Sequence, residues 1–230
     1  MQYYLLKRMM NNFFNSLKRK KTDQVFNPWF DFDYQNDVDE TSPKKRLANL
    51  KYYLDERINA DYLLVAEALG YQGGHFTGIP MTSERIILGY KSSSGILATH
   101  VSNSPLNRTS KISIKKNGFT EPTATILWQK LIEDNLDTRK FVFWNAFPWH
   151  PYDSSDGILS NRTPSNMEIK EGESVLIELL DTIQFKKVIA IGNKAEAILK
   201  NLGLSVEKVR HPANGGAKKF REQILQTIKI

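Results

Sequence analysis

Polar side chains follow four short apolar runs of the sequence, and their types suit acid–base and hydrogen-bonding chemistry. They are a carboxylate, two amides and an imidazole: Glu67, Asn145, Asn193 and His211. Ligands of open α/β sheets bind beyond the carboxyl ends of the strands, where such residues would meet. We therefore expect Glu67, Asn145 and His211 to share a site. We interpret Asn193 as the cap of the helix that follows it, because Asn is favoured at that position.

The segments that must position these residues alternate between strand and helix patterns. Short apolar runs predict strands at 62–65, 141–144, 188–191 and 206–210. Helical patterns, one opened by a Ser165–Glu168 capping box, occur at 47–58, 122–137, 165–182, 193–203 and 217–228. Strands separated by helices imply right-handed crossovers and a parallel sheet. The predicted fold class is α/β: a three-layer α/β/α sandwich with a central four-stranded parallel sheet.

The composition excludes several classes of chemistry. The chain has 230 residues and no cysteine, which rules out disulfides, Cys-ligated zinc, iron–sulfur clusters and a thiol nucleophile. No apolar run approaches the roughly 18 residues of a membrane span, so we expect no membrane partner. Residues 183–230 contain ten basic and three acidic residues, which equals the net charge of +7 of the whole chain. That segment is either a surface for an anionic partner or a solvated lysine-rich face.

The N-terminal region has a different charge pattern. Residues 1–21 contain six basic and no acidic residues, whereas residues 23–40 contain six acidic and no basic ones. We predict that residues 1–24 form a basic tail, disordered or in a loosely attached helix. Residues 22–43 are expected to be an extended arm that packs its aromatic side chains onto the body. We expect residues 25–230 to form one domain.

Two other segments raise alternatives. The glycine-rich loop 70–78 can be interpreted as a phosphate cradle, but it matches neither G-x-G-x-x-G nor the Walker pattern, and a flexible turn explains it equally. His150, Asp153 and Asp156 lie together in a polar loop and have types that bind metals. We interpret them as solvated loop residues, and we expect neither a metal site nor a cofactor.

Several segments, in order along the chain, resemble motifs of the uracil-DNA glycosylase superfamily. Residues 65–70 (VAEALG) and 76–84 (FTGIPMTSE) resemble its first motif, and residues 143–146 (FWNA) resemble the strand that ends in the uracil-reading Asn. Residues 161–165 (NRTPS) resemble a segment of the iron–sulfur branch. Residues 210–216 (RHPANGG) resemble the motif with the catalytic His and the loop that enters DNA. The resemblance covers roughly residues 25–230. Any one motif is weakly specific, and the ordered set is more so.

The resemblance implies roles for these residues. His211 would donate a hydrogen bond to the departing uracil O2, and Glu67 would position or activate water or favour the cationic sugar. Asn145 would read the uracil O4 and N3–H. The residues implied to bind the base are Ala68, Tyr71, Gln72, Met81 and Asn145. Those implied to bind DNA are Pro212, Ala213, Asn214, Gly215, Gly216, Lys218, Lys219 and Arg221.

The chain departs from the family pattern at three positions. Ala68 stands where several branches have Asp or Asn, Leu69 replaces a proline, and Met81 replaces the usual stacking Phe. The iron–sulfur branch holds its cluster with four cysteines, so a chain without cysteine is expected to be cofactor-free.

The leading hypothesis is a monomeric DNA glycosylase of base-excision repair that removes uracil, and also other deaminated bases, from single- or double-stranded DNA. We expect it in the cytoplasm of a bacterial or virus-infected cell, or in the nucleus or mitochondrion of a eukaryote. One alternative is a non-catalytic relative that binds uracil or DNA. Another is a nucleotide-binding hydrolase that uses loop 70–78.

Overall fold

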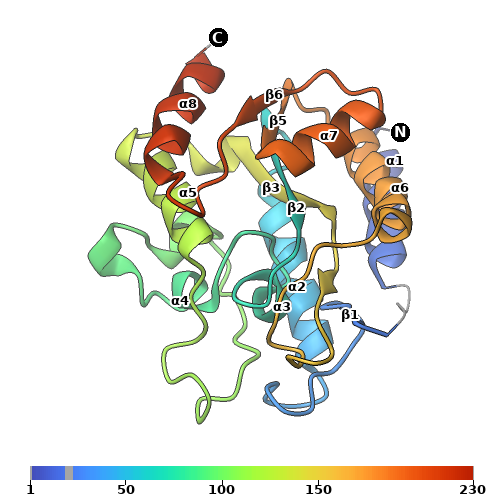
Figure 1. Ribbon diagram of the computed structural model, residues 1–230, viewed down its shortest axis with the longest axis vertical. Coiled ribbons are helices and arrows are strands. Elements are labelled where there is room, and N and C mark those ends of the chain that lie inside the picture. Colours follow the sequence, from blue (N-terminus) through green and yellow to red (C-terminus); the bar gives the residue numbers. More distant parts are fainter. Residues whose placement is uncertain (1, 19–22, 230) are drawn as a thin grey trace.

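The computed structural model describes residues 2–18 and 23–229 (Figure 1). Its centre is a parallel sheet with strand order β3-β2-β5-β6. The four strands are β2 (Tyr62–Ala68), β3 (Phe141–Phe147), β5 (Lys187–Ile191) and β6 (Glu207–Val209). Tyr62 of the central strand lies opposite Phe141 on one side and Lys187 on the other. The predicted four-stranded parallel sheet is confirmed.

Helices cover both faces of this sheet, as the sandwich prediction requires. In Figure 1, α5 and α8 lie on one side of the sheet and α6 and α7 on the other, with α1 packed against α6. The helices are α1 (Gln2–Leu17), α2 (Ser42–Asp55), α3 (Gly74–Thr77), α4 (Glu84–Ile87), α5 (Pro122–Glu133), α6 (Asn166–Thr182), α7 (Asn193–Asn201) and α8 (Ala217–Lys229), with 3₁₀ turns at Ser92–Ser94, Ala98–His100 and Thr138–Lys140. None of the helices in the described ranges has the length and apolarity needed to cross a bilayer.

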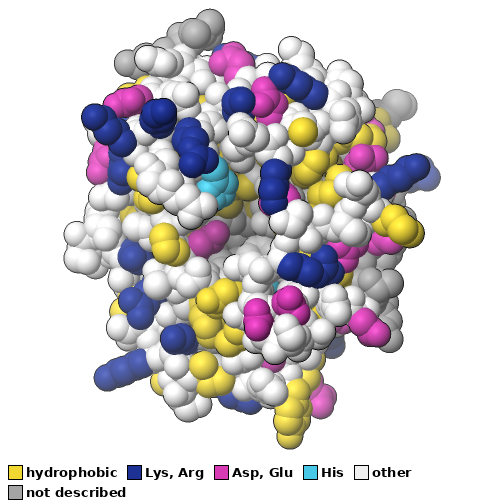
Figure 2. Space-filling model, in the orientation of Figure 1, with side chains coloured by type: hydrophobic (Ala, Val, Ile, Leu, Met, Phe, Trp, Pro, Cys, Tyr) yellow, Lys and Arg dark blue, Asp and Glu magenta, His cyan; other side chains and the backbone are white. Residues whose placement is uncertain are grey.

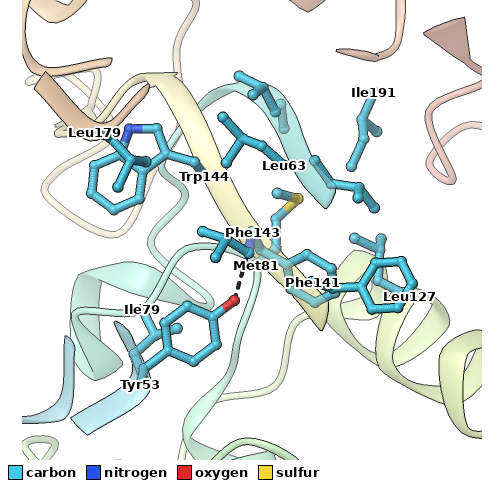
Figure 3. Close-up of a cluster of buried hydrophobic side chains, with 14 of the residues drawn as sticks. Tyr53, Leu63, Ile79, Met81, Leu127, Phe141, Phe143, Trp144, Leu179 and Ile191 are labelled. Carbon is cyan, nitrogen blue, oxygen red and sulfur yellow. Dashed lines mark hydrogen bonds between the residues drawn. The ribbon is translucent and has the colours of Figure 1, made fainter. Parts of the chain in front are cut away.

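The strands read as continuous apolar runs because both faces of the sheet are covered. Every residue of β3 is buried, and Trp144 and Phe143 are completely enclosed. Figure 3 shows these rings with Met81 and Tyr53 in the core. The Tyr53 hydroxyl accepts a hydrogen bond from the Phe143 N–H at 2.8 Å, so a polar tip from α2 is satisfied inside the apolar layer.

The starts of α6 and α7 give different outcomes for the two helix caps predicted from the sequence. Ser165 Oγ accepts from the Glu168 N–H at 3.3 Å, and Glu168 Oε2 accepts from the Ser165 N–H at 2.7 Å, as the capping box predicts. The interpretation of Asn193 as a cap is wrong. Gly192 occupies the cap position with φ +88°, and Asn193 is the first residue of α7. A β-carbon at Gly192 would also lie 3.1 Å from His211 Cβ, so a side chain there is disfavoured.

The N-terminal segment packs onto the body. Residues 2–17, which we expected as a tail or a loosely attached helix, form α1, whose buried side chains include Phe13 and Leu17. The Leu17 carbonyl accepts hydrogen bonds from Trp149 Nε1 at 3.1 Å and from Asn27 Nδ2 at 2.7 Å. Residues 1 and 19–22 lie outside the described residues, and a domain boundary near residue 25 stays a prediction.

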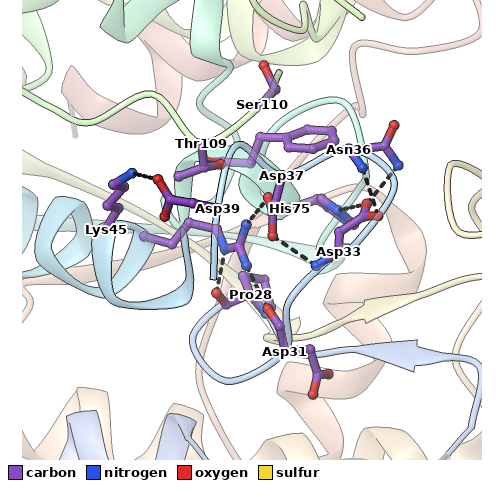
Figure 4. A network of polar contacts seen from close by, with 12 residues as sticks. Pro28, Asp31, Asp33, Asn36, Asp37, Asp39, Lys45, His75, Thr109 and Ser110 are labelled. Atoms are coloured by element: carbon purple, nitrogen blue, oxygen red, sulfur yellow. Dashed lines mark hydrogen bonds and ion pairs between the residues drawn. The ribbon is translucent and has the colours of Figure 1, made fainter. Parts of the chain in front are cut away.

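The acidic arm after α1 buries carboxylates as well as aromatic rings. Its short strand β1 (Val25–Phe26) pairs antiparallel with β4 (His150–Pro151). Trp29 is buried as expected, but Phe30 is 49% exposed. The carboxylates of Asp33 and Asp37 are buried instead (Figure 4), and Asp37 contacts the enclosed Arg46 guanidinium. Asp37 Oδ1 lies 2.6 Å from Arg46 Nη1, which explains why the acids point inward.

Candidate active site

A cavity of about 780 Å³ opens at the carboxyl ends of β2, β5 and β6. Three chain segments that follow or end these strands form much of its wall: residues 66–70, 191–194 and 210–214. The start of α5 and the pair Asn161–Arg162 complete it. Figure 2 shows a hollow in this face, bordered by a histidine with Lys and Arg side chains close by. This is the position where open α/β sheets bind ligands.

The cavity brings together seven of the residues that the resemblance implies to be catalytic or to bind the base or DNA. They are Glu67, Ala68, Gln72, His211, Pro212, Ala213 and Asn214. Tyr71, Met81 and Asn145 do not line it, and neither do the residues from Gly215 onward. The two candidate catalytic residues therefore share one cavity.

Glu67 is ion-paired with a lysine from α7. Its Oε1 lies 3.1 Å from Lys194 Nζ, and the Glu67 side chain is 27% exposed. The same ammonium group donates to Thr163 Oγ1 at 2.6 Å. Lys194 thus bridges the end of β2 and the loop before α6, and it places a positive charge in the cavity that the sequence did not single out.

His211 is half-buried, and a backbone contact defines its tautomer. Its Nδ1 accepts a hydrogen bond from the Ala213 N–H at 3.1 Å, so the ring hydrogen belongs on Nε2. Within the described part of the chain, Nε2 has no hydrogen-bond partner. Burial, followed by the nearby Arg210 charge, lowers the pKa of His211. The ring is therefore neutral at pH 7 and can donate from Nε2 to a molecule in the cavity.

The loop after His211 is a tight turn that projects outward. Asn214 and Gly215 both have positive φ, +52° and +73°, a conformation that favours Gly and Asn. A β-carbon at Gly216 would lie 2.0 Å from the His211 carbonyl oxygen, so only glycine fits there. Ala213, Asn214 and Gly215 are exposed.

The three basic residues predicted to bind DNA are placed unequally. Lys218 and Lys219 are exposed on the first turn of α8. Arg221 is half-buried, and its Nη2 donates to Gln129 Oε1 of α5 at 3.4 Å. The two lysines are therefore better placed than the arginine to meet an anionic partner.

Asn145 lies behind the cavity wall in β3. It is 1% exposed, and its Nδ2 donates to the Ala68 carbonyl at 2.9 Å. Its Oδ1 is buried and finds no hydrogen-bond partner in the described ranges. Ala68 itself lines the cavity, so this one residue separates the Asn145 amide from the cavity. The acceptor Oδ1 of Asn145 is left without a hydrogen bond among the described residues.

Tyr71 and Met81 are positioned by other parts of the molecule. Met81 is 4% exposed and belongs to the hydrophobic core. The Tyr71 N–H donates to Asn161 Oδ1 at 3.1 Å, and its ring lies 6.4 Å from that of His150. Apolar side chains at the cavity wall come from Leu69 and from Ile126 of α5 instead.

Glu121, at the N-cap position of α5, is a cavity residue that the sequence reasoning missed. Its Oε2 is buried without a hydrogen-bond partner among the residues described. Burial raises the pKa of Glu121 to about 7. The carboxyl packs so closely on Gly73 that a β-carbon there would lie 2.0 Å from Oε2. A Glu before a Pro looks like an ordinary helix start, and no sequence signal marks its burial.

The loop of His150, Asp153 and Asp156, expected from the sequence to be solvated, is partly buried. His150 is completely buried, with its Nδ1 3.0 Å from His75 Nδ1 and its Nε2 2.7 Å from the Ser160 carbonyl oxygen. The interpretation of His150 as a solvated loop residue is therefore wrong. Asp153 accepts hydrogen bonds from Ser155. Across the described residues, no cluster of three or more His, Asp or Glu side chains is arranged to hold a metal ion.

The fold and this cavity define an α/β protein whose strand ends place a carboxyl group and a neutral imidazole in one cavity. The sequence model of the uracil DNA glycosylase superfamily matches residues 56–229, and the chain belongs to that superfamily. The crystal structure of wild-type Pedobacter heparinus SMUG2 is similar in fold, with a TM-score of 0.60 and 14% sequence identity over 96% of this chain and 97% of that one. The comparison with curated proteins gives no match.

Membership in the superfamily supports a glycosylase-type hydrolase that acts on DNA. The chain has no cysteine, so it has no ligands for a cysteine-held cluster. The motifs quoted from the sequence between residues 65 and 216 all fall in the matched range.

Proposed function

We propose that the protein is a monomeric uracil-DNA glycosylase that needs no cofactor and hydrolyses the N-glycosidic bond of uracil, and of other deaminated bases, in DNA. The observation that carries this proposal is the state of His211. It is neutral, its Nε2–H is unpartnered among the described groups, and it lines the same cavity as Glu67, which is ion-paired with Lys194.

The reaction needs charge stabilisation on both sides of the bond that breaks. The sugar becomes oxocarbenium-like, and the base leaves with the electron pair of the bond. His211 Nε2–H donates to the developing negative charge on the base, and preorganised donors of this kind contribute about 3–4 kcal/mol. The Glu67 carboxylate favours the cationic sugar and orients the water that adds to C1′.

Asn145 supplies the chemistry that selects uracil. Its amide carries a donor and an acceptor, which match the O4 and N3–H of uracil but not the edge of cytosine. The unused Oδ1 supports this role, because a buried acceptor without a partner is costly unless a ligand supplies one. A small shift of the strand end or the ligand would bring the amide and the base together.

The projecting loop and the lysines beyond it are the proposed DNA contacts. The base must leave the stack to enter the cavity, at a cost of a few kcal/mol. The loop 211–216 would occupy the space that the base vacates, while Lys218 and Lys219 bind phosphates. Replacing both lysines by Ala should weaken DNA binding and flatten its dependence on salt concentration. The matched control is the double substitution of Lys115 and Lys116, an exposed pair outside the cavity wall.

The deciding experiment is a gel assay for abasic sites on uracil-containing oligonucleotides, single- and double-stranded. Wild-type protein should give abasic product, and His211→Ala and Asn145→Asp should each lower the single-turnover rate by about 100-fold or more. Product at an unchanged rate in both variants would contradict the assignment of the site. No product at high protein concentration, with DNA still bound, would favour a non-catalytic relative.

The glycine-rich loop argues against the nucleotide-hydrolase alternative. The Cβ positions of Gly73 and Gly74 are filled by the Glu121 carboxyl and the Leu69 side chain, at 2.0 and 2.3 Å. A phosphate cradle presents backbone N–H groups to an anion. Here the Glu121 carboxyl and the Leu69 side chain already pack against these two glycines, where a phosphate would have to approach the loop.

A further inference from the structure

The sequence contains two Asn-Gly pairs, Asn117–Gly118 and Asn214–Gly215, and the structure gives them opposite environments. In such a pair the backbone nitrogen of the glycine can attack the asparagine side chain, because glycine has no β-carbon to hinder the approach. The second pair lies in the loop that the proposed function brings to DNA. Whether either pair reacts depends on whether its glycine nitrogen is free.

Asn214 and Gly215 are the two central residues of the turn that follows His211. A hydrogen bond from the Gly216 N–H to the Ala213 carbonyl, at 3.1 Å, closes this turn. The central peptide takes no part in that bond, and the Gly215 N–H has no acceptor among the residues that the structure describes. Both central residues are exposed, and a β-carbon at Gly215 would meet nothing within 4 Å. The peptide between them therefore has room to rotate while the turn stays closed.

The nitrogen of the other pair is already used. The Gly118 N–H donates to the Lys115 carbonyl at 2.9 Å, so it makes the bond that closes its own turn. Gly118 is buried, and a β-carbon there would lie 2.7 Å from Glu84 Cβ. Its carbonyl accepts a hydrogen bond from Arg85 Nε at 3.1 Å. This pair can react only after the segment opens, which makes it an internal control for the first.

We propose that Asn214 is a site of spontaneous deamidation, in which the Gly215 nitrogen attacks the side-chain amide and position 214 becomes an aspartate or an isoaspartate. The nitrogen gives its proton to hydroxide and bonds to Asn214 Cγ. The Cγ–Nδ2 bond breaks, and Nδ2 takes up a proton and leaves as ammonia. Water then opens the five-membered ring at Cγ, which gives aspartate, or at the main-chain carbonyl, which gives isoaspartate. Water is the only co-reactant, and a neutral amide is replaced by a carboxylate.

The modification changes the loop in two ways. The chemical step does not depend on the proposed glycosylase function, whereas its effect on DNA rests on that function. A carboxylate at position 214 places a negative charge where the loop meets phosphates, and like charges across an interface disfavour binding. Isoaspartate also adds one carbon to the main chain of the turn. Gly216 has no room to adjust, because a β-carbon on it would lie 2.0 Å from the His211 carbonyl oxygen. The longer turn would disturb the Ala213 N–H bond that defines the His211 tautomer.

The first test follows the masses of two tryptic peptides, residues 211–218 and 117–130, while folded wild-type protein ages at physiological temperature and alkaline pH. Peptide 211–218 should gain about 1 Da and separate into aspartate and isoaspartate forms. Peptide 117–130 should react about tenfold more slowly or less, because the buried pair must first open locally. Asn214→Gln, whose longer side chain cannot close the five-membered ring, should keep the mass of its peptide constant.

The second test measures function on the same samples. The affinity for a uracil-containing duplex and the single-turnover rate of aged wild type should fall in proportion to the modified fraction. Asn214→Gln should hold its own starting values over the same period, and Asn117→Gln should age as wild type does. Fresh Asn214→Asp isolates the effect of the charge. It should bind the duplex about 3- to 10-fold more weakly than fresh wild type at low salt, with a smaller difference at high salt.

The outcomes separate the modification from the function. A constant mass of peptide 211–218 overturns the proposal, and equal rates in the two peptides overturn its structural basis. Modified protein that binds and cleaves as before overturns the effect on DNA. Fresh wild type without abasic product overturns the proposed glycosylase function, while the peptide masses still decide whether Asn214 deamidates.

Discussion

Two regions of the molecule differ in how their buried polar atoms are hydrogen-bonded. One is the polar network of Asp33, His75 and His150 beneath the acidic arm, and the other is the cavity at the strand ends. In this network, His75 Nε2 lies 3.1 Å from Asp33 Oδ2 (Figure 4). On the other side of the ring, His75 Nδ1 lies 3.0 Å from His150 Nδ1, so each group faces a partner. At the strand ends, Glu121 Oε2 and Asn145 Oδ1 have no partner among the residues that the structure describes. Polar atoms left unsatisfied in one place indicate where a ligand is expected to supply the missing hydrogen bonds.

The two regions also respond to pH with opposite signs. Burial lowers the pKa of His75 to about 4 and that of His150 to about 3. Between pH 6.5 and 4 the unfolded chain binds more protons at these rings, so stability falls as pH falls. Burial raises the pKa of Glu121 from 4.5 to about 7. Between those values the folded state binds the proton, so stability falls as pH rises.

The largest predicted effect on stability comes from a substitution in the polar network of Asp33, His75 and His150. Asp33→Ala removes the acceptor that faces His75 Nε2 and Asn36 Nδ2, at 3.1 and 2.8 Å, and leaves buried groups without partners. We expect a loss of about 3 kcal/mol in the free energy of unfolding, measured by urea titration with tryptophan fluorescence. The glycosylase rate per folded molecule should be unchanged.

Asp153→Ala is the matched control for this prediction, because Asp153 is an exposed acid with local partners. It should change stability by less than about 0.5 kcal/mol. If Asp33→Ala changed the free energy of unfolding as little as Asp153→Ala, the hydrogen bonds of the polar network would not stabilise the fold. If it abolished activity in folded protein, the two regions would not be separate.

The second prediction concerns the stability of the cavity wall. Glu121→Gln removes a titrating carboxyl, so it should raise the free energy of unfolding at pH 8 by on the order of 1–3 kcal/mol and by much less at pH 5. Urea titrations at the two pH values measure the difference, with Glu133→Gln as the control. A variant that is less stable than wild type at pH 8 would show that the carboxylate supports the fold. A gain in stability at pH 8 would show that the ionised carboxylate is destabilising in the native state.

The fold could be predicted from the sequence because its strands are apolar on both faces and its helices carry local signals. The strands predicted at 141–144 and 188–191 were too short but correctly placed, and Ser165 marked the start of α6. The cap at Asn193 was wrong because the positive φ of Gly192, which no pattern announces, places the helix start one residue earlier. The capping box at Ser165 could be predicted from residue types, whereas the backbone conformation at Gly192 could not.

The candidate site was predictable where residues lie at the end of a strand or in the loop that follows it. Glu67 and His211 line the cavity because they lie at the ends of β2 and β6. Glu121 joins them from a helix start far away in sequence, and its burial depends on Gly73 packing against it. Asp33 shows the same limit, since its burial follows from a tertiary contact with His75. Exposure of a charged residue is decided by partners that the sequence does not bring together.

The smallest predicted effect tests whether the cavity is open to solvent. Lys194 and Glu67 form an ion pair at 3.1 Å with side chains 59% and 27% exposed. Such a pair is screened by water and salt, so Lys194→Ala should change the free energy of unfolding by less than about 1 kcal/mol, and the change should vanish in about 1 M NaCl. Lys200→Ala, which breaks the similarly exposed pair with Glu196, is the control and should give the same value. A loss of more than about 2 kcal/mol for Lys194→Ala alone would mean that its charge is desolvated. The cavity would then resemble the buried polar network around His75, and its unpartnered polar atoms would need a structural explanation.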